Sequence, residues 1–239
     1  MLPTREELEI AVAAYWQTKD QQLAVARTIR STAEGSSKAV RGGGHFNPLV
    51  NLLSRFFTDA GYPLESVGAK GSSVVLPSYF RPTKQWDLVV VHRGVLVAAL
   101  EMKALGGPSF GNNYNNRVEE ALGSSADLSR ANITGLTGPE KPWLGYLFLM
   151  DDADGSRRPT NPQRGPFPAE KVWHGRSYQD RFEVTGQRLL DEGYYDAVCY
   201  LVSSAEDPGP REPSPQLDWQ HFAAAISARI EFLSNLGYP

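Results

Sequence analysis

The stretch Ser78-Tyr-Phe-Arg-Pro-Thr-Lys-Gln-Trp-Asp87-Leu-Val-Val-Val-His-Arg-Gly94-Val-Leu-Val-Ala-Ala-Leu-Glu101-Met-Lys103 decides the fold and the candidate chemistry of this chain. Two apolar runs flank a short polar break that ends in Gly94, which predicts a β-hairpin. Asp87 opens the first run, and Glu101 and Lys103 close the second. A carboxylate at the buried edge of a sheet is costly unless it is paired or bound to a metal, so the three charges need an explanation.

The register of this hairpin decides whether the three charges meet. Glu101 and Lys103 share one face of a strand because they are two residues apart. A two-residue loop would turn Asp87 to the opposite face, whereas a three-residue loop ending at Gly94 pairs Asp87 with Ala99 and turns it toward Glu101. A glycine at the last loop position favours the three-residue loop, and a bulge in one strand would give the same phase. We expect Gly94 at positive φ, with one face formed by Asp87, Val97, Ala99, Glu101 and Lys103 and the core face by Leu88, Val90, Ala98, Leu100 and Met102.

Two carboxylates and a lysine on one face predict a divalent-metal site beside a cation. Mg²⁺ takes oxygen ligands, commonly one or two carboxylates together with phosphate oxygens of a substrate. Such an ion polarises the phosphate and lowers the pKa of a bound water, which lysine can orient. The implied reaction is phosphodiester hydrolysis. A surface salt bridge between Glu101 and Lys103 is the plainer alternative, and the residues alone leave both readings open.

An Asp, a spacer and Glu-x-Lys on consecutive strands resemble the PD-(D/E)XK nucleases, with Trp86 in place of the usual proline. Four segments resemble the XhoI restriction endonucleases more specifically: Tyr79–Lys84, Trp86–Val89, Leu96–Lys103 and Gly107–Ala121. The resemblance implies a Mg²⁺-dependent type II restriction endonuclease, in which Asp87 and Glu101 hold the metal with the Met102 carbonyl and Lys103 positions the water. It also implies double-stranded DNA as substrate, a homodimer that cuts a palindrome similar to CTCGAG, and a DNA methyltransferase as functional partner. A further acid is implied on the first core helix, where this chain has Asn47, with Asp59 and Glu65 nearby; the third ligand stays open.

Candidate DNA contacts follow from side-chain chemistry. Asparagine can bind adenine with two hydrogen bonds, and arginine can bind guanine in the same way. Asn112, Asn113, Asn115 and Arg117 follow the second hairpin strand in a predicted loop. Turn chemistry is the plainer alternative, with Asn116 as the cap of a helix over residues 117–131. Other basic residues expected in loops are Arg81, Lys84, Arg157, Arg158, Lys38 and Arg41.

The composition limits the classes of protein to which this chain can belong. The chain has 239 residues, of which 41% are hydrophobic and 21% charged, which is typical of one soluble globular domain. A single cysteine excludes an internal disulfide and a zinc site built from thiolates. No apolar run approaches membrane-spanning length and the N-terminus does not resemble a signal peptide, so we expect no membrane contact and a bacterial cytoplasmic location. The net charge of −3 argues against indiscriminate nucleic-acid binding but allows a specific positive face.

Apolar periodicity predicts helices over residues 4–33, 47–60, 117–131, 177–192 and 216–235, and strands over 74–80, the hairpin, 143–150 and 194–202. This order predicts an α/β fold with a mixed central β-sheet flanked by helices, and a restriction-endonuclease-like αβββαβ core with extra N- and C-terminal helices. We expect a single nuclease domain over residues 1–239, with an N-terminal helical region at 1–44, a catalytic core at 45–204 and the C-terminal helix at 216–235. The alternatives are a structure-selective repair or junction-resolving nuclease on the same core, and a non-catalytic DNA-binding module.

Overall fold

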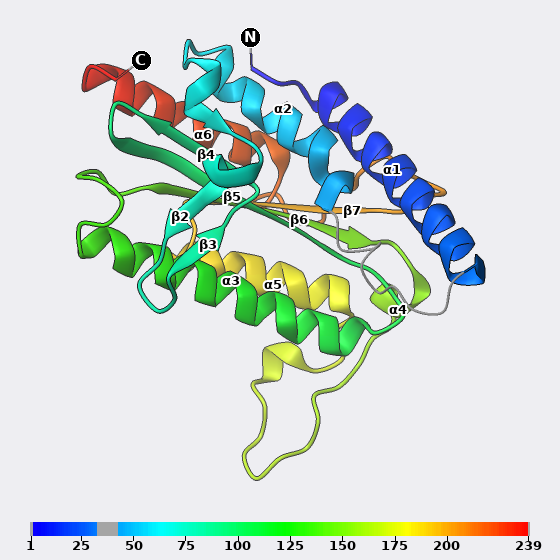
Figure 1. Ribbon diagram of the computed structural model, residues 1–239. Helices are drawn as coiled ribbons and strands as arrows, with labels where there is room; N and C mark the ends of the chain where they lie inside the picture. The colour runs from blue at the N-terminus through cyan, green and yellow to red at the C-terminus, as the bar shows by residue number, and fades with distance from the viewer. Residues whose placement is uncertain (1, 33–42, 239) are drawn as a thin grey trace.

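The structure is a computed structural model that describes residues 2–32 and 43–238 (Figure 1). Within these described residues a five-stranded mixed sheet has the strand order β1-β4-β5-β6-β7. The strands β1, β4 and β5 are antiparallel neighbours, whereas β5, β6 and β7 run parallel. The bounds of these strands are β1 (Val67–Gly68), β4 (Leu88–His92), β5 (Val95–Leu105), β6 (Trp143–Asp151) and β7 (Ala197–Ser203).

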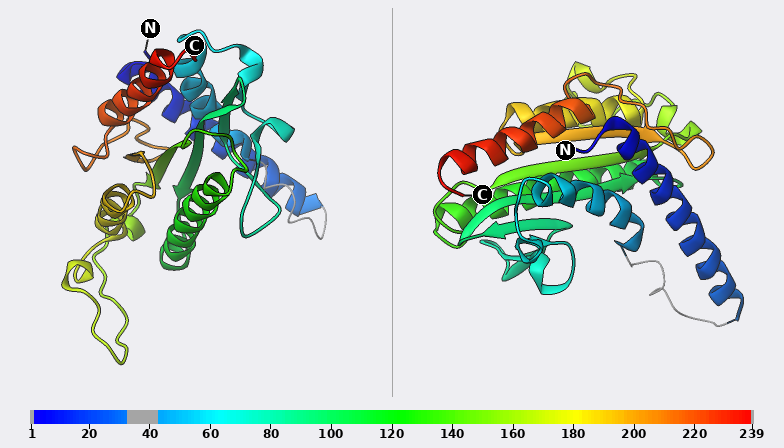
Figure 2. Two further views of the ribbon diagram at one scale, coloured as in Figure 1. Left: turned by 90° about the vertical axis from the view of Figure 1, so that its left-hand side faces the viewer. Right: turned by 90° about the horizontal axis from the view of Figure 1, so that it is seen from above.

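Helices cover both faces of the sheet (Figures 1 and 2). One face packs against α1 (Arg5–Thr32), α2 (Asn47–Thr58) and α6 (Trp219–Asn235), and the other against α3 (Phe110–Ile133) and α5 (Tyr178–Asp191). Shorter helical segments are α4 (Asp154–Arg157), η1 (Gly43–Phe46), η2 (Leu64–Ser66), η3 (Gly71–Val74) and η4 (Lys171–Trp173). The described part of the chain contains no helix long and apolar enough to cross a membrane.

Two smaller elements stand outside the central sheet. The strands β2 (Val75–Pro77) and β3 (Thr83–Gln85) pair with each other as a separate antiparallel ribbon. Residues 158–175, between α4 and α5, form an arm that projects from the body in Figure 1 and in the left view of Figure 2. The exposed side chains of Arg164 and Phe167 lie on this arm.

Each sheet face buries its own apolar cluster. Leu100 and Met102 belong to the cluster under α1, α2 and α6, and Ala99 to the cluster under α3 and α5. The strands β6 and β7 are buried along almost their whole length, as expected for parallel strands covered on both faces. The α/β fold class predicted from the element order is thereby confirmed.

Several predicted elements need correction. The strand predicted at 74–80 is shorter, β2 over Val75–Pro77, and it pairs within the ribbon; the strand beside β4 in the central sheet is β1. The helix α3 begins at Phe110, not at 117, so the predicted asparagine loop forms its first turns and Asn116 does not cap it. The strand β7 begins at Ala197, three residues after the predicted start. The predicted helix over 177–192 agrees closely with α5, whose start is fixed by a capping box of Ser177 and Asp180.

Candidate active site

The β4–β5 hairpin turns through two residues, not three. His92 pairs with Val95, and the loop residues Arg93 and Gly94 have φ values of 49° and 78°. Positive φ at both loop positions is the geometry of a type I′ turn, whose twist matches the flanking strands. The predicted positive φ of Gly94 is therefore confirmed, and the predicted three-residue loop is wrong.

A bulge at Val97 turns Asp87 and Glu101 to the same face of the hairpin, which the two-residue loop alone would not do. Val91 pairs with Leu96, but its neighbour Val90 pairs with Ala98, so Val97 is an extra residue on β5. Val97 packs in the cluster under α1, α2 and α6, which corrects its predicted place on the site face. The core face is otherwise as predicted, with Leu88, Val90, Ala98, Leu100 and Met102 in that cluster.

Below the bulge, the register brings the two acids together. Leu88 pairs with Leu100, so Asp87, one residue earlier, lies across from Glu101. The Asp87 Oδ2 atom accepts the backbone N–H of Met102 at 2.7 Å. Burial and then the nearby Glu101 carboxylate raise the pKa of Asp87 above its ordinary value, against the opposing effect of Lys103.

Glu101 is 4% exposed and is held by two lysines. Lys103 forms an ion pair with its Oε1 atom, and the Nζ of Lys84 lies 2.5 Å from its Oε2 atom. Burial tends to lower the pKa of Lys103, but Glu101 and Asp87 outweigh it, so that pKa lies above the ordinary value. Burial dominates at Lys84 and lowers its pKa. The site thus contains two carboxylates and two amino groups in close contact.

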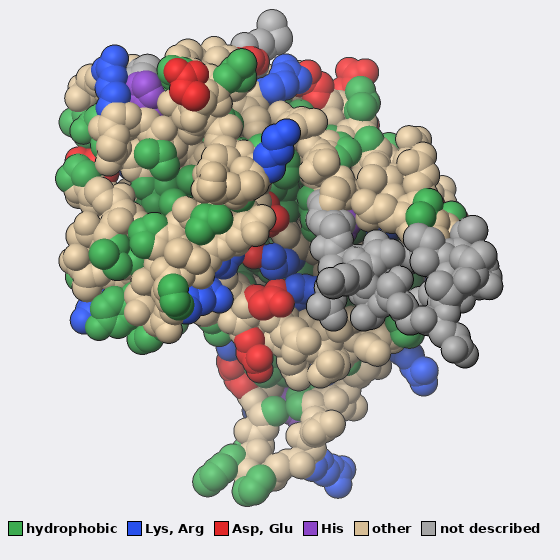
Figure 3. All heavy atoms as spheres, viewed as in Figure 1, with side chains coloured by type: hydrophobic (Ala, Val, Ile, Leu, Met, Phe, Trp, Pro, Cys, Tyr) green, Lys and Arg blue, Asp and Glu red, His purple; other side chains and the backbone are tan. Residues whose placement is uncertain are grey.

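An open pocket of about 470 Å³ lies over Glu101 and the two lysines. Its walls come from the β2–β3 ribbon, β5 and α3, and consist of Arg81, Thr83, Lys84, Gln85, Glu101, Lys103, Arg117, Glu119, Glu120, Gly123 and Ser124. Side chains of both charges gather in a hollow near the centre of the face shown in Figure 3. From the sequence, Lys84 was expected only as a basic residue in a loop. It lies two residues before Trp86, and this spacing was the available signal that both side chains share one face of a strand. In the structure the Lys84 Nζ atom lies 4.1 Å from the centre of the Trp86 ring.

Comparison with known proteins matches residues 27–211 to the family described as restriction endonuclease XhoI. The chain belongs to this family. It is 35% identical over 187 residues to the type II restriction enzyme XhoI of Xanthomonas vasicola, covering 77% of this chain and 75% of the relative. It is 36% identical over 178 residues to BstVI of Geobacillus stearothermophilus (72% and 79%), and 51% identical over 90 residues to AbrI of Azospirillum brasilense (37% and 40%). No solved structure matches the chain.

The family assignment confirms the resemblance inferred from the hairpin and its flanking segments. A member of the XhoI family is an endonuclease of a restriction system, a hydrolase that acts on DNA. Asp87 and the pocket that Glu101 and Lys103 line both lie within the matched residues.

The positions considered for a third acidic ligand lie away from the pocket. None of Asn47, Asp59 and Glu65 lines the pocket over Glu101. Asn47 is exposed at the start of α2, and Asp59 lies 3.7 Å from Arg55. Among the described residues no group of three histidine, cysteine or acidic side chains has the arrangement of a metal site.

The predicted DNA contacts fall into different surroundings. Arg117 lines the pocket over Glu101 and forms an ion pair with Glu120. Asn112 and Asn115 line a separate polar pocket of about 590 Å³ between the start of α3 and the arm. Asn113 lines neither of these two pockets.

The predicted basic contacts are mostly engaged within the protein. Arg81 pairs with Asp127, and the Nε atom of Arg157 lies 2.7 Å from Asp152. Arg158 is exposed at the start of the arm. Lys38 and Arg41 lie outside the described residues, so their proposed contacts stay predictions.

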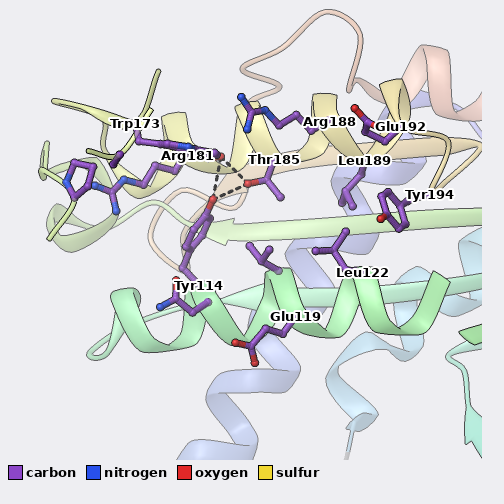
Figure 4. A pocket seen from close by; sticks show the side chains of 14 residues that line it. Tyr114, Glu119, Leu122, Trp173, Arg181, Thr185, Arg188, Leu189, Glu192 and Tyr194 are labelled. Atoms are coloured by element: carbon purple, nitrogen blue, oxygen red, sulfur yellow. Dashed lines mark hydrogen bonds between the residues drawn. The ribbon is translucent and has the colours of Figure 1, made fainter. Parts of the chain in front are cut away.

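A third pocket, of about 490 Å³, lies between α3 and α5 (Figure 4). Tyr114, Leu122 and Leu189 line it, and the Tyr114 hydroxyl hydrogen-bonds the Thr185 hydroxyl at 2.6 Å. Its lining is mainly apolar and carries no convergent pair of acids among the residues described. This groove therefore lacks the groups that phosphodiester chemistry requires.

Proposed function

We propose that this protein is a Mg²⁺-dependent, site-specific type II deoxyribonuclease whose catalytic residues are Asp87, Glu101 and Lys103. The observation that carries the proposal is that Asp87 lies across from Glu101 beside Lys103, and that Glu101 and Lys103 line an open pocket of a XhoI-family chain. Two acids and a lysine are a donor set suited to a divalent cation and a water nucleophile. A PD-(D/E)XK arrangement is the simplest description of this set.

The residues present fit Mg²⁺. Both acids supply hard oxygen ligands, and Asp87 uses its Oδ2 atom for Met102 and retains Oδ1. Because the N–H and C=O of one strand residue leave on the same side, the Met102 carbonyl faces the edge on which Asp87 lies. Asp87, Glu101 and the Met102 carbonyl would therefore hold the ion. When bound, Mg²⁺ supplies charge stabilisation at the phosphate and a more acidic water.

The chain's own residues then position the substrate. The Lys103 ammonium pairs with Glu101 in the pocket wall, where it can donate a hydrogen bond to a water or to a phosphate oxygen. Arg117 and Arg81 add positive charge to the pocket walls, which offsets Glu119 and Glu120 and favours a phosphodiester backbone.

Sequence recognition is assigned to the start of α3 and the arm. Asn112 and Asn115 share a polar pocket with Asn161 and Gln163 of the arm. From Arg117 to Asn112 the helix rises about 8 Å, roughly two steps of a DNA strand. Carboxamides at that spacing from the cleavage pocket can read base edges near the cut. We carry over a palindrome similar to CTCGAG from the resemblance.

The proposed enzyme acts as a homodimer, because a two-fold protein matches a two-fold DNA site. A methyltransferase of the same specificity is the proposed functional partner that protects the host DNA. Bacterial cytoplasm is the location in which such a pair would work.

Digestion of a sequenced plasmid tests the proposal. With Mg²⁺ we expect discrete fragments whose sequenced ends share one palindrome, and no cleavage with EDTA. Cleavage confined to branched DNA would favour the junction-resolving alternative. Specific binding without cleavage by any divalent cation would leave a DNA-binding module.

A further inference from the structure

Lys84 is an unusually enclosed lysine. It lies on β3 of the ribbon, and its side chain is 10% exposed. Its Nζ atom is 2.5 Å from Glu101 Oε2, 3.1 Å from the Gln85 carbonyl and 4.1 Å from the centre of the Trp86 ring. Lysines are rarely buried without a partner, so the contact with Glu101 is what makes this position tolerable.

The two lysines together occupy the oxygens of Glu101. Lys103 takes Oε1 and Lys84 takes Oε2, so two carboxylates and two ammonium groups balance the charge of the metal-free site. A divalent cation binds carboxylate oxygens at about 2.1 Å. An ammonium on the same oxygen would repel that cation strongly. Moving one lysine away from Glu101 would relieve this repulsion when a cation binds.

The fold holds Lys84 less rigidly than Lys103. Lys103 is on β5, only two residues from Glu101 on the same strand face, and its backbone is fixed by the ladder to β6. Lys84 comes from the separate ribbon, with a flexible four-carbon stem and the open pocket beside it. Arg81 and Arg117 mark the pocket walls as a surface for a phosphate.

We propose that Lys84 is a built-in counter-ion of the metal site: it neutralises Glu101 in the metal-free protein and moves to a DNA phosphate oxygen when the divalent cation binds. This inference rests on the proposed function of the same pocket. Lys84 would thus be an active-site residue beyond the set Asp87, Glu101 and Lys103.

Calcium binding without DNA gives the first test. Isothermal titration at pH 8 compares the parent protein with Lys84→Met, Lys84→Gln and the exposed control Lys70→Met. Removing a unit positive charge beside the ligand oxygen should tighten Ca²⁺ binding by about tenfold or more. Lys70→Met should bind Ca²⁺ like the parent. Unchanged or weaker binding by a folded Lys84 variant, with thermal unfolding as the check of folding, overturns the inference.

Tryptophan fluorescence gives an independent readout. Because Lys84 lies over Trp86, its departure should change the Trp86 emission during a Ca²⁺ titration. The change should vanish in Trp86→Phe and in Lys84→Met, and persist in Lys70→Met. A full change in Lys84→Met overturns the inference.

The two hypotheses fail in different ways. If Glu101→Gln abolishes Ca²⁺ binding and the Lys84 variants match the parent, only the role of Lys84 is wrong. If the parent does not bind Ca²⁺ or Mg²⁺, or if Asp87→Asn and Glu101→Gln bind as it does, the proposed metal site fails and the role of Lys84 fails with it.

Discussion

The Asp127 carboxylate accepts the Nε–H of Arg81 at 2.8 Å and so ties α3 to the ribbon that carries Lys84. The same carboxylate accepts the backbone N–H groups of Tyr79 at 2.7 Å and Phe80 at 2.9 Å. Its side chain is only 4% exposed. Arg81, predicted as a DNA contact, thus has a structural task as well, which is to hold the ribbon turn beside the active-site pocket.

Asp127→Asn should destabilise the protein by about 2 kcal/mol, because hydrogen bonds to a buried charged group contribute roughly 1.5–3 kcal/mol. Urea denaturation measures the free energy of unfolding. Asp154→Asn, at a fully exposed acid, is the matched control and should change it little. Equal stability of the two variants would contradict the structural task given to Asp127.

The contribution of Asp127 should depend on pH. Burial alone would raise its pKa, but the two N–H groups and Arg81 outweigh burial, so the folded pKa lies below the ordinary value. A lowered folded pKa stabilises the protein above the unfolded pKa of about 3.9, and this stabilisation is lost as the pH falls through the folded pKa. The stability gap between parent and Asp127→Asn should therefore be larger at pH 6 than in strong acid, as urea denaturation at several pH values would show. A stability difference between parent and Asp127→Asn that grows in acid would contradict a lowered pKa of Asp127.

Removing charges of the catalytic group should separate cleavage from binding. Glu101→Gln and Lys103→Met should each slow plasmid cleavage by roughly 100-fold or more, since positioned groups of this kind contribute such factors. Specific DNA binding, measured by gel shift with Ca²⁺ omitted, should persist. Glu65→Gln, at an exposed acid outside the pocket, should cut like the parent. Near-parental cleavage by either catalytic variant would refute the site.

The hairpin turn should tolerate glycine far better than a branched residue. Gly94 has a φ of 78°, and Gly94→Val should cost about 1–3 kcal/mol from backbone strain, although a Cβ there would meet no atom within 4 Å. Gly123→Ala, in the interior of α3 and also free of clashes, should instead stabilise the protein by about 0.5–1 kcal/mol. Thermal unfolding should show a lower melting temperature for Gly94→Val and a higher one for Gly123→Ala. A change in the same direction for both variants would contradict the assigned turn.

If α3 reads bases, changes in its asparagines should affect binding at single base-pair positions. Asn112→Ala or Asn115→Ala should weaken binding by about 1–3 kcal/mol at one base-pair position of the site and not at the others. Competition with single-substitution DNA sites measures this pattern. Asn116→Ala is the control, because Asn116 is an exposed residue of the same helix outside the polar pocket. A uniform loss over all sites would indicate phosphate contact instead.

Sequence reasoning located the hairpin that carries the candidate site because charges inside apolar runs are rare and costly. It predicted that Asp87 and Glu101 share a face, but it favoured a three-residue loop as the reason. The choice between that loop and a bulge depends on how Val97 packs under the helices, which the sequence does not reveal. It also missed the start of α3, because Gly111 and its asparagines have weak helix propensity that tertiary packing overrides. The position of Lys84 depends on the ribbon, whose short strands carry little periodic signal.

The bulge at Val97 also separates the hairpin into two independent halves. The tip, with Arg93 hydrogen-bonded to the Gly237 carbonyl at 3.2 Å, lies on the far side of the bulge from Asp87 and Glu101. Pairing of Leu88, Val89 and Val90 with β5 fixes the acids without help from the tip. Peptides with an odd or an even number of residues, inserted between Arg93 and Gly94, should therefore leave Asp87 and Glu101 on the same face. The tip is thus a suitable attachment point for a dye or a second targeting domain.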